Sequence, residues 1–425
     1  MKRRKIQKAL AAVMMLVAVL SFGACRLVPD ASSDAAVSVV LKPSIPAQTD
    51  GAVPTDAAEP TASPTESEAP AATEETEAPA ELSPVPTYLN PLTGTLVDVD
   101  PSGLRPIAVV VDNSTAARAH QTGLERADIL YETLTAPGIT RFLAVYSDYR
   151  TVPEICNVRA GKVHDVKLAS QYNAVLICHG GHADDNADYD FVTAMKRVYG
   201  SEYAYVNTQK EPAWSAQNGE TLGTLKYYTD GYRSDLKYDT VVSPAAIEFT
   251  AAQKKYSDFS AAGYSVSGEV KRAYDIAGGL PAGETATGVT VKFTAAGAFS
   301  PLEKTVSFKY SAADGKYLRF EDSAPHVDAS SGRQLAFDNV LVLRADVRYI
   351  AGDSEIDPLT TSVAVYGSGT GYYLSGGRYV SIVWVNTAEE GLTLYSPGGE
   401  IALAAGNTYI GYVDRTNDGA VTLTM

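Results

Sequence analysis

The order of apolar and polar positions divides the chain into four stretches. A basic start leads into an apolar run from Ala9 to Leu20, and residues 26–88 then contain almost nothing that could build a core. Residues 89–250 alternate short apolar runs with segments of helical spacing, whereas residues 251–425 hold shorter alternating runs between Gly, Asp and Ser turns. The pattern predicts a leader, a tether and two folded parts.

The first folded part is expected to mix strands and helices. Four segments have the apolar content of buried strands: Ile107–Val111, Asp128–Leu134, Ile139–Tyr146 and Ala174–Cys178. Two segments place apolar residues at helical spacing: Gly161–Tyr172 and Asp188–Tyr199. Strands that alternate with helices predict an α/β domain over residues 89–250.

The second folded part is expected to be an antiparallel β-rich domain over residues 251–425, with a helix at Ala245–Tyr256 beside the boundary. Its predicted strands are short and alternate in polarity: Val289–Phe293, Thr305–Tyr310, Tyr317–Glu321, Val340–Leu343, Ser362–Tyr366, Tyr379–Val385, Tyr409–Val413 and Ala420–Thr424. The fold class predicted for the whole chain is therefore α+β, with a disordered tether ahead of an α/β domain and a β-rich domain.

The leader has the features of an export signal. Five basic side chains precede the apolar run of twelve residues, which is shorter than the about 20 residues that a membrane-spanning helix needs. Small residues then lead to Cys25, as in a lipobox, although Phe22 stands where an aliphatic residue is usual. We expect cleavage before Cys25 and lipidation of its thiol. A secreted protein or an uncleaved anchor is the alternative.

The second stretch is predicted to be a disordered linker rich in Pro, Glu, Ala and Thr. Residues 26–88 hold ten of the 22 prolines, with eleven acidic residues against two basic ones. Such a composition cannot bury a core, and its prolines and like charges favour extended chain. The simplest interpretation is a spacer, and the sharper one is a spacer that crosses a thick cell wall.

Charge and cysteine content narrow the possible functions. The net charge of −15 argues against a nucleic-acid partner, which needs a basic surface to displace phosphate counterions. Three cysteines are too few for a disulfide framework. Cys156 and Cys178 could pair or remain buried thiols, and the sequence leaves both possibilities open. No cofactor is expected.

Several stretches in order along the chain match a known family. In the first half they are Asn90–Gly94, Arg105–Asn113, Ala127–Glu132, Gly138–Phe142, Val158-Arg159 and Ala174–His179. In the second half they are Pro325–Asp328, Asn339-Val340 and Gly371–Gly377. The chain thereby resembles the YerB-like lipoproteins, whose folded region has N-terminal and C-terminal domains of unknown function of the DUF3048 type. The resemblance implies a surface lipoprotein of a Gram-positive bacterium and no catalytic assignment.

Two departures from that family affect polar residues. Where the family tends to have Val-Arg-Ser-Ala-Arg, this chain has Val158-Arg159-Ala160-Gly161-Lys162. Where the family tends to have Pro-His-Asn, the best placement here is Lys237-Tyr238-Asp239. Both differences fall where a polar site shared by the family would lie.

The first candidate site combines strand-end residues with arginines. Asp112 and Asn113 end a predicted strand, while Arg141 and Arg159 offer planar guanidinium groups that suit carboxylate or phosphate. The simplest interpretation is that Asp112 caps the next element or pairs with an arginine to stabilise the fold. The alternative is that the arginines bind an anionic envelope component, to which Asp112 and Asn113 could add hydrogen bonds.

Three further candidates have simpler structural explanations. His179 and His182, with Asp184 and Asp185, resemble zinc ligands, but a glycine turn explains them and no metal is predicted. His326 and Asp328 share one face of a strand and could form an acid–base pair. Asn339 completes the candidate ligand-binding set. Tyr372-Tyr373 could stack on sugars, although tyrosines are also common on half-buried strands.

Two functions remain. The first is a lipid-anchored protein on the extracellular face of the cell membrane that binds peptidoglycan, another wall polymer or an envelope protein. The alternative is a cell-envelope hydrolase or transferase that acts on wall polymers with groups near His179 or His326. Convergence of Asp112, Arg141, Arg159 and His179 in one cleft would distinguish a built site from surface binding.

Overall fold

The computed structural model describes residues 86–199, 205–207, 222–226, 239–242, 274–276, 279, 281–294, 303–351 and 359–425. The signal peptide with Cys25, nearly all of the tether, the helix at Ala245–Tyr256 and the domain boundary near residue 250 lie outside these ranges, so those expectations stay predictions. In the described part of the chain, no helix combines the length and apolarity needed to cross a membrane.

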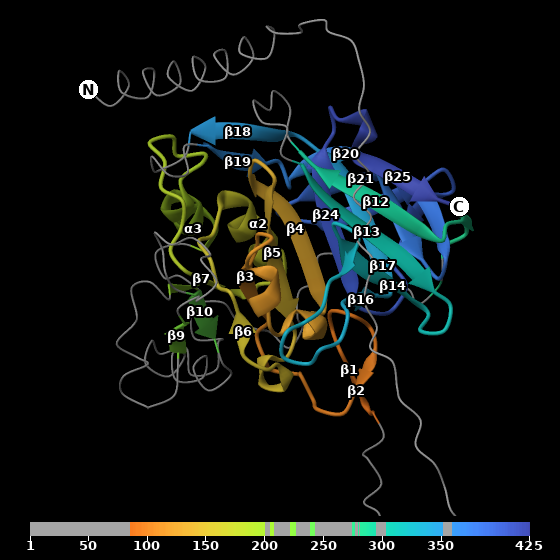
Figure 1. The fold of residues 1–425 in the computed structure, drawn as a ribbon, viewed down its shortest axis with the longest axis horizontal. Helices are drawn as coiled ribbons and strands as arrows, with labels where there is room; N and C mark the ends of the chain where they lie inside the picture. The colour runs from red at the N-terminus through yellow and green to blue at the C-terminus, as the bar shows by residue number, and fades with distance from the viewer. Residues whose placement is uncertain are drawn as a thin grey trace, which may run out of the picture. The chain divides into compact units, whose positions relative to one another are not determined.

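One large mixed sheet runs through the described residues (Figure 1). Its twelve strands include β11 (Glu284–Thr285), which pairs with β21. The others follow in spatial order: β23 (Gly399–Ile401), β22 (Gly391–Ser396), β21 (Arg378–Thr387), β20 (Gly367–Ser375), β17 (Asn339–Ala345), β24 (Thr408–Asp414), β4 (Ile129–Ala136), β5 (Ile139–Tyr146), β3 (Ile107–Asn113), β7 (Val175–Cys178) and β8 (Tyr205–Asn207).

The two halves of the sequence meet inside this sheet. Strand β24 runs parallel to β17 on one side and to β4 on the other, with Ile410 opposite Leu341 and Tyr131. The expectation of purely antiparallel pairing in the second half is therefore wrong at β24. All seven residues of β24 are buried, and a strand covered on both faces can occupy the centre of a sheet in parallel pairing.

A second sheet of six strands covers one face of the large sheet around β24. Its strands are β15 (Ala324–Pro325), β14 (Lys316–Glu321), β13 (Lys304–Ser311), β12 (Gly288–Phe293) and β25 (Val421–Thr424), with β16 (Ala336–Phe337) on β14. The Phe308 ring lies 4.6 Å from the Tyr409 ring, centre to centre, and Phe337 lies 5.7 Å from the same ring. These aromatic contacts form the core between the two sheets.

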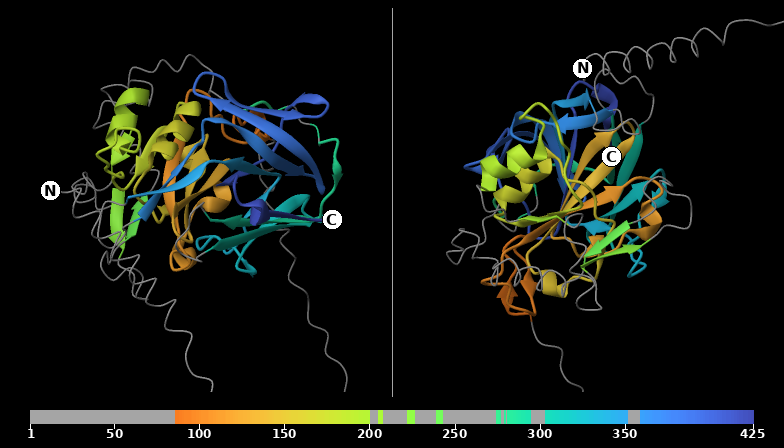
Figure 2. Two further views of the ribbon diagram at one scale, coloured as in Figure 1. Left: turned by 90° about the horizontal axis from the view of Figure 1, so that it is seen from above. Right: turned by 90° about the vertical axis from the view of Figure 1, so that its left-hand side faces the viewer.

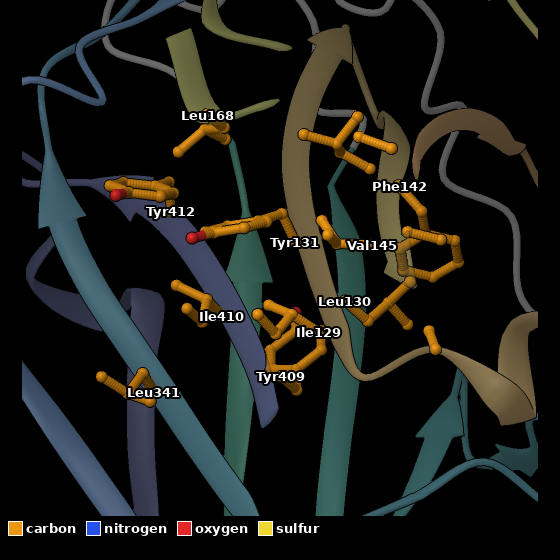
Figure 3. Close-up of a cluster of buried hydrophobic side chains, with 14 of the residues drawn as sticks. Ile129, Leu130, Tyr131, Phe142, Val145, Leu168, Leu341, Tyr409, Ile410 and Tyr412 are labelled. Atoms are coloured by element: carbon orange, nitrogen blue, oxygen red, sulfur yellow. The ribbon is translucent and has the colours of Figure 1, made fainter. Parts of the chain in front are cut away.

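The helices α2 (Val163–Gln171) and α3 (Phe191–Tyr199) lie together on the other face of the large sheet (Figure 2). Tyr131 and Tyr412 point to this side, where the Tyr131 hydroxyl lies 2.6 Å from that of Tyr172 (Figure 3). Leu130 and Tyr409 point to the opposite side. Strands β4 and β24 therefore have apolar side chains on both faces.

Shorter elements surround the two sheets. They are the pair β1 (Tyr88–Leu89) and β2 (Leu96–Val97), the pair β18 (Val347–Ala351) and β19 (Leu359–Val363), the three-stranded sheet of β6 (Ile155–Cys156), β10 (Asp239–Val242) and β9 (Leu222–Lys226), and the 3-10 turns η1 (Arg118–His120), η2 (Leu124–Arg126), η3 (Tyr149–Thr151) and η4 (Asp418–Ala420).

The structure is β-rich, as the alternation predicts, and the described residues hold two α-helices. Both helices start two to three residues later than their predicted segments. The run Ser362–Tyr366 is misplaced, because the strand there is β19, which ends at Val363. The hairpin of β4 and β5 turns at Pro137-Gly138, with Gly138 at a φ of +69°, a backbone conformation that suits glycine.

Candidate functional site

The chain segment after β6 crosses the carboxyl ends of the parallel strands β3 and β7. The Asp112 amide donates to the Asn157 carbonyl, and the Arg159 amide donates to the Val110 carbonyl, each at 2.9 Å. The His179 amide then donates to the Arg159 carbonyl at 2.9 Å. The fold thus brings Asp112, Arg159 and His179 to one edge of the sheet, where ligands commonly bind in folds with parallel strands.

Asp112 and Arg159 form an ion pair at this edge. The Arg159 Nε lies 3.1 Å from Asp112 Oδ2, and the two side chains are 10% and 5% exposed. The other carboxylate oxygen of Asp112 accepts the Ser114 amide at 2.9 Å. Asp112 therefore caps a turn and pairs with an arginine, as the simplest interpretation of the sequence predicts.

Arg141 joins the same neighbourhood from β5. Its guanidinium donates to the Ala160 carbonyl at 2.6 Å, and the side chain is half-buried. At the start of α2, the Lys162 amide donates to Asp165 Oδ2 at 2.7 Å, and the Lys162 ammonium donates to the Thr360 hydroxyl on β19. We call Arg141, Arg159 and Lys162 the cationic cluster.

The cationic cluster and burial together change the protonation of nearby groups. Burial, and then the Arg159 charge, lowers the pKa of His179 to about 4. Burial, and then Lys162, lowers the pKa of His164 to about 3. Burial raises the pKa of Asp165 to about 6. Both histidines are therefore neutral at pH 7 in a positive local potential.

The other polar groups around His179 do not form a metal site. His182 Nε2 lies 3.5 Å from Asp184 Oδ2, and Asp185 is exposed. Within the described ranges, no group of three or more His, Cys, Asp or Glu side chains is arranged to hold a metal ion. Cys156 and Cys178 are both buried free thiols, which answers the question about pairing that the sequence left open.

Asn113 belongs to a different cluster, which is fully buried between the two sheets. Its amide donates to Glu132 Oε1 on β4 and to the Thr140 hydroxyl, each at 2.9 Å. The second Glu132 oxygen accepts Arg319 on β14 and the Tyr409 hydroxyl, each at 2.8 Å. A carboxylate with both oxygens filled in this way is held in place by both halves of the chain.

His326 lies at the other end of this cluster. Its Nε2 donates to the Gln121 Oε1 at 2.5 Å, while its Nδ1 accepts from Arg319. Burial, and then the Arg319 and Lys304 charges, holds the pKa of His326 well below its usual value. We call Glu132, Lys304, Arg319, Glu321 and His326 the buried ionic network.

Each carboxylate of the network lies against buried cations. Lys304 Nζ lies 2.8 Å from Glu321 Oε1, and Arg319 bridges Glu132 at 2.8 Å and Glu321 at 3.3 Å. The partly exposed Arg118 adds a third cation, 3.5 Å from Glu321 Oε1. Burial alone would raise the pKa of Glu321, but Lys304 and Arg319 outweigh it, and that pKa is lowered. Glu321 is therefore ionised and paired, as a buried carboxylate must be to persist.

The remaining candidates have separate structural partners. Asp328 accepts the Glu125 amide at 3.2 Å and the Ser330 hydroxyl at 2.6 Å, so its contacts differ from those of His326. Asn339 donates to the Ala404 carbonyl at 2.8 Å and accepts the Tyr373 hydroxyl at 2.9 Å. Both side chains are buried and lie within local hydrogen-bond groups.

Comparisons with known proteins agree with the matches seen in the sequence. Residues 92–229 match the model of the N-terminal domain of a protein family of unknown function, DUF3048, and residues 296–410 match that of its C-terminal domain. The chain belongs to the DUF3048 family. The family description assigns no activity.

A DUF3048 relative in Bacillus subtilis (strain 168) is named Putative lipoprotein YerB. The two are 24% identical over 296 residues, which cover 69% of this chain and 77% of the relative. The crystal structure of YerB protein from Bacillus subtilis is similar, with a TM-score of 0.59 at 20% identity, over 79% of this chain and 99% of that chain. These likenesses connect the chain to a lipoprotein and to a shared fold.

Proposed function

We propose that this chain is a membrane-anchored lipoprotein on the extracellular face that binds an anionic component of the cell wall through the cationic cluster. The lipobox ending at Cys25 and the lipoprotein name of the relative support this location at the membrane. The linker of residues 26–88 would hold the folded part at a distance from the membrane.

We also propose an α/β character for residues 89–250. The parallel strands β3, β7 and β8 are adjacent, and along the chain α2 precedes β7 and α3 follows it.

The observation that carries the binding proposal is the convergence of cations at one sheet edge. Arg141 is half-buried, and it stands beside the segment that carries Arg159 and Lys162. Among the described residues, Asp112 pairs with Arg159, and Asp165 accepts the Lys162 amide. Three cations thus lie close together in a chain whose net charge is −15, and guanidinium groups are suited to phosphate and carboxylate.

The protonation states favour binding over catalysis at this edge. A general base works best when its pKa lies near the working pH, and a pKa of about 4 makes His179 a poor base. Burial raises the pKa of the Cys178 thiol, so it does not supply a thiolate nucleophile. These two groups therefore support a binding site better than the hydrolase or transferase alternative.

A titration with a defined polyanion tests the proposal. The mature chain from residue 26 onwards, which lacks both the apolar leader and the lipidated cysteine, is titrated with soluble poly(glycerol phosphate), and the dissociation constant is measured by calorimetry. Arg141→Ala should weaken binding about tenfold, since it removes a charge-assisted contact. The matched control is Arg197→Ala on α3, whose side chain is 57% exposed and pairs with Asp188. It should leave binding unchanged.

The salt dependence gives a second criterion. Binding that uses the half-exposed Arg141 should weaken as salt rises, and the dependence should be smaller in Arg141→Ala. A wild-type protein that does not bind the polyanion, or an Arg141→Ala variant that binds it as tightly as wild type, contradicts the proposal.

A further inference from the structure

The face of the large sheet that the second sheet covers continues beyond it. Val340 on β17 lies opposite Tyr409 on β24, and both point towards the second sheet. On β20, Leu374 lies opposite Val340, so it points to the same side, and it is fully buried. Because cross-strand partners share a face, the next rows on β20, β21 and β22 can be assigned to this side from the register.

Where the second sheet no longer covers it, this side of β20, β21 and β22 carries tyrosine side chains and small side chains with hydroxyl groups. Tyr372 is opposite Ser381, Thr370 is opposite Val383, and Val383 is opposite Tyr395 on β22. Val383 is 48% exposed and Tyr395 is 39% exposed. With Tyr379, which is opposite Leu374, these residues form what we call the tyrosine face: Thr370, Tyr372, Tyr379, Ser381, Val383 and Tyr395.

The platform beneath the tyrosine face is rigid. Alternate glycines of β20 point to the opposite side, where Trp384 packs against Gly369 and donates from its indole to the Arg344 carbonyl at 3.2 Å. A Cβ at Gly369 would lie 2.8 Å from the Trp384 nitrogen, so this close approach requires glycine. Trp384 is fully buried, and its packing fixes the strands that carry the exposed rings.

The tyrosine face is amphipathic. Its six members carry no charged group, and two carboxylates on the same side border it, because Glu284 is opposite Tyr379 and Glu400 is opposite Tyr395. The Tyr372 and Tyr379 rings are 6.2 Å apart at 56°, and the Tyr379 hydroxyl donates to Glu284 at 3.1 Å. Glu400, opposite Tyr395, stands at the other rim. Ring faces with hydroxyls between them and carboxylates at the edge suit a ligand that is apolar on its faces and rich in hydroxyls around them.

We infer that the tyrosine face binds a neutral polysaccharide chain of linked hexose rings. Sugar rings present C–H groups on their faces and hydroxyls at their edges, so they can stack on Tyr372 and Tyr395 and donate to Glu284 and Glu400. From a strand spacing of about 4.8 Å and a rise of about 3.4 Å per residue, the backbone positions of these two tyrosines are roughly 12 Å apart, about the span of two linked hexoses. This inference rests on the proposed function only in assuming that the chain faces the cell wall.

The size of the face favours a glycan over a protein partner. A stable protein interface uses about 20–30 residues on each side, whereas the tyrosine face has six. An extended sugar chain needs only a row of stacking rings. On an open sheet surface, both ends of the sugar chain can extend past the protein. Exposed apolar and aromatic groups of this kind generally mark interaction sites.

Retention on uncharged glycan tests the inference. The mature chain from residue 26 onwards is incubated with insoluble β-1,4-linked N-acetylglucosamine polymer and with wall glycan from which protein and anionic polymers have been removed. Wild type should be retained on both. Tyr395→Ala and Val383→Asp should each reduce retention at least about fivefold, while Tyr395→Phe, which keeps the ring, should retain most of it.

Two controls separate this result from misfolding and from the cationic cluster. Tyr88→Ala removes a tyrosine that is 43% exposed on β1, away from the face, and should bind as wild type. Arg141→Ala should also bind the uncharged glycan as wild type, so the two proposals can fail independently. Unchanged thermal unfolding of Tyr395→Ala shows that any loss belongs to the surface.

Three outcomes would overturn the inference. Wild type could fail to bind either glycan, Tyr395→Ala could be retained as well as wild type, or retention could require wall protein and vanish when that protein is digested. The third result would assign the face to a protein partner.

Discussion

The buried ionic network and the cationic cluster both gather charged side chains, yet their surroundings differ. In the network, Glu132, Arg319 and Glu321 are fully buried, and each carboxylate lies against a cation. In the cluster, Arg159 and Lys162 are buried, and Arg141 remains half-exposed. Enclosed and paired charge fixes one arrangement of the two sheets, whereas a cation that reaches the surface can contact a ligand.

The contrast also separates the sequence candidates. Asn113 and His326, proposed as ligand contacts, lie in or beside the enclosed network. Arg141, Arg159 and His179 lie at the sheet edge. The comparison therefore divides one candidate list into residues that hold the fold and residues that we propose contact the ligand.

The largest effect on stability is expected when Arg319 is removed from the buried ionic network. Arg319→Ala should lower the free energy of unfolding by about 3–5 kcal/mol, because Glu132 and Glu321 would be left buried without their bridge. Urea unfolding of the full chain measures this change. The control Arg333→Ala removes a side chain that is 68% exposed and pairs with Glu125, and it should cost less than about 1 kcal/mol. Equal effects would contradict the assigned structural role.

A smaller loss is expected from the inner part of the cluster. Arg159→Ala should cost about 2 kcal/mol, since the Asp112 carboxylate, which is 5% exposed, loses its charged partner. Arg159→Lys should recover part of that stability through its charge. Urea midpoints for the two variants measure the difference, and a fully stable Arg159→Ala protein would show that the pair contributes little.

The sequence predicted elements better than it predicted their partners. Apolar runs located β3, β4, β5 and β7 closely, because periodicity reflects local burial. The joining of β24 to β4 across 277 residues between Glu132 and Tyr409 has no local signal, since register between distant strands is set by tertiary packing. Patterns along the chain therefore could not show that both halves share one sheet.

The site was predicted in part for the same reason. Strand-end position pointed to Asp112, and guanidinium chemistry pointed to Arg159; the two side chains do meet. Sequence reasoning missed Glu132, Arg319 and Glu321, although a signal existed for two of them. Arg319 and Glu321 occupy the same inward-facing, alternate positions of β14 as Tyr317. Charged residues at the buried positions of an alternating strand indicate an ionic core cluster.

The free energy of unfolding should depend on pH through His164, which lies beside the cationic cluster. The pKa of His164 is about 3 in the folded state against an ordinary value of 6.5. Below pH 6.5 the unfolded state binds a proton that the folded state does not, so stability falls as pH falls towards 3, by about 2 kcal/mol between pH 7 and 5. His164→Gln should lose that part of the slope. Asp165, with its pKa raised to about 6, contributes with the opposite sign in both proteins.

Unfolding in urea at pH 7 and pH 5 measures this difference between wild type and His164→Gln. Equal slopes would mean that His164 is protonated in the folded protein, which would contradict a neutral imidazole hydrogen-bonded to Thr133.

The smallest change in stability should accompany the largest change in binding. Arg141 is half-buried, and its guanidinium donates to the Ala160 carbonyl, so Arg141→Ala should cost about 1 kcal/mol of unfolding free energy. The decisive measurement is the dissociation constant of this variant for poly(glycerol phosphate), taken on the same samples as its urea midpoint. We predict a near-native midpoint with binding about tenfold weaker. Native binding by Arg141→Ala, or weakening that appears only with lost stability, would contradict the account.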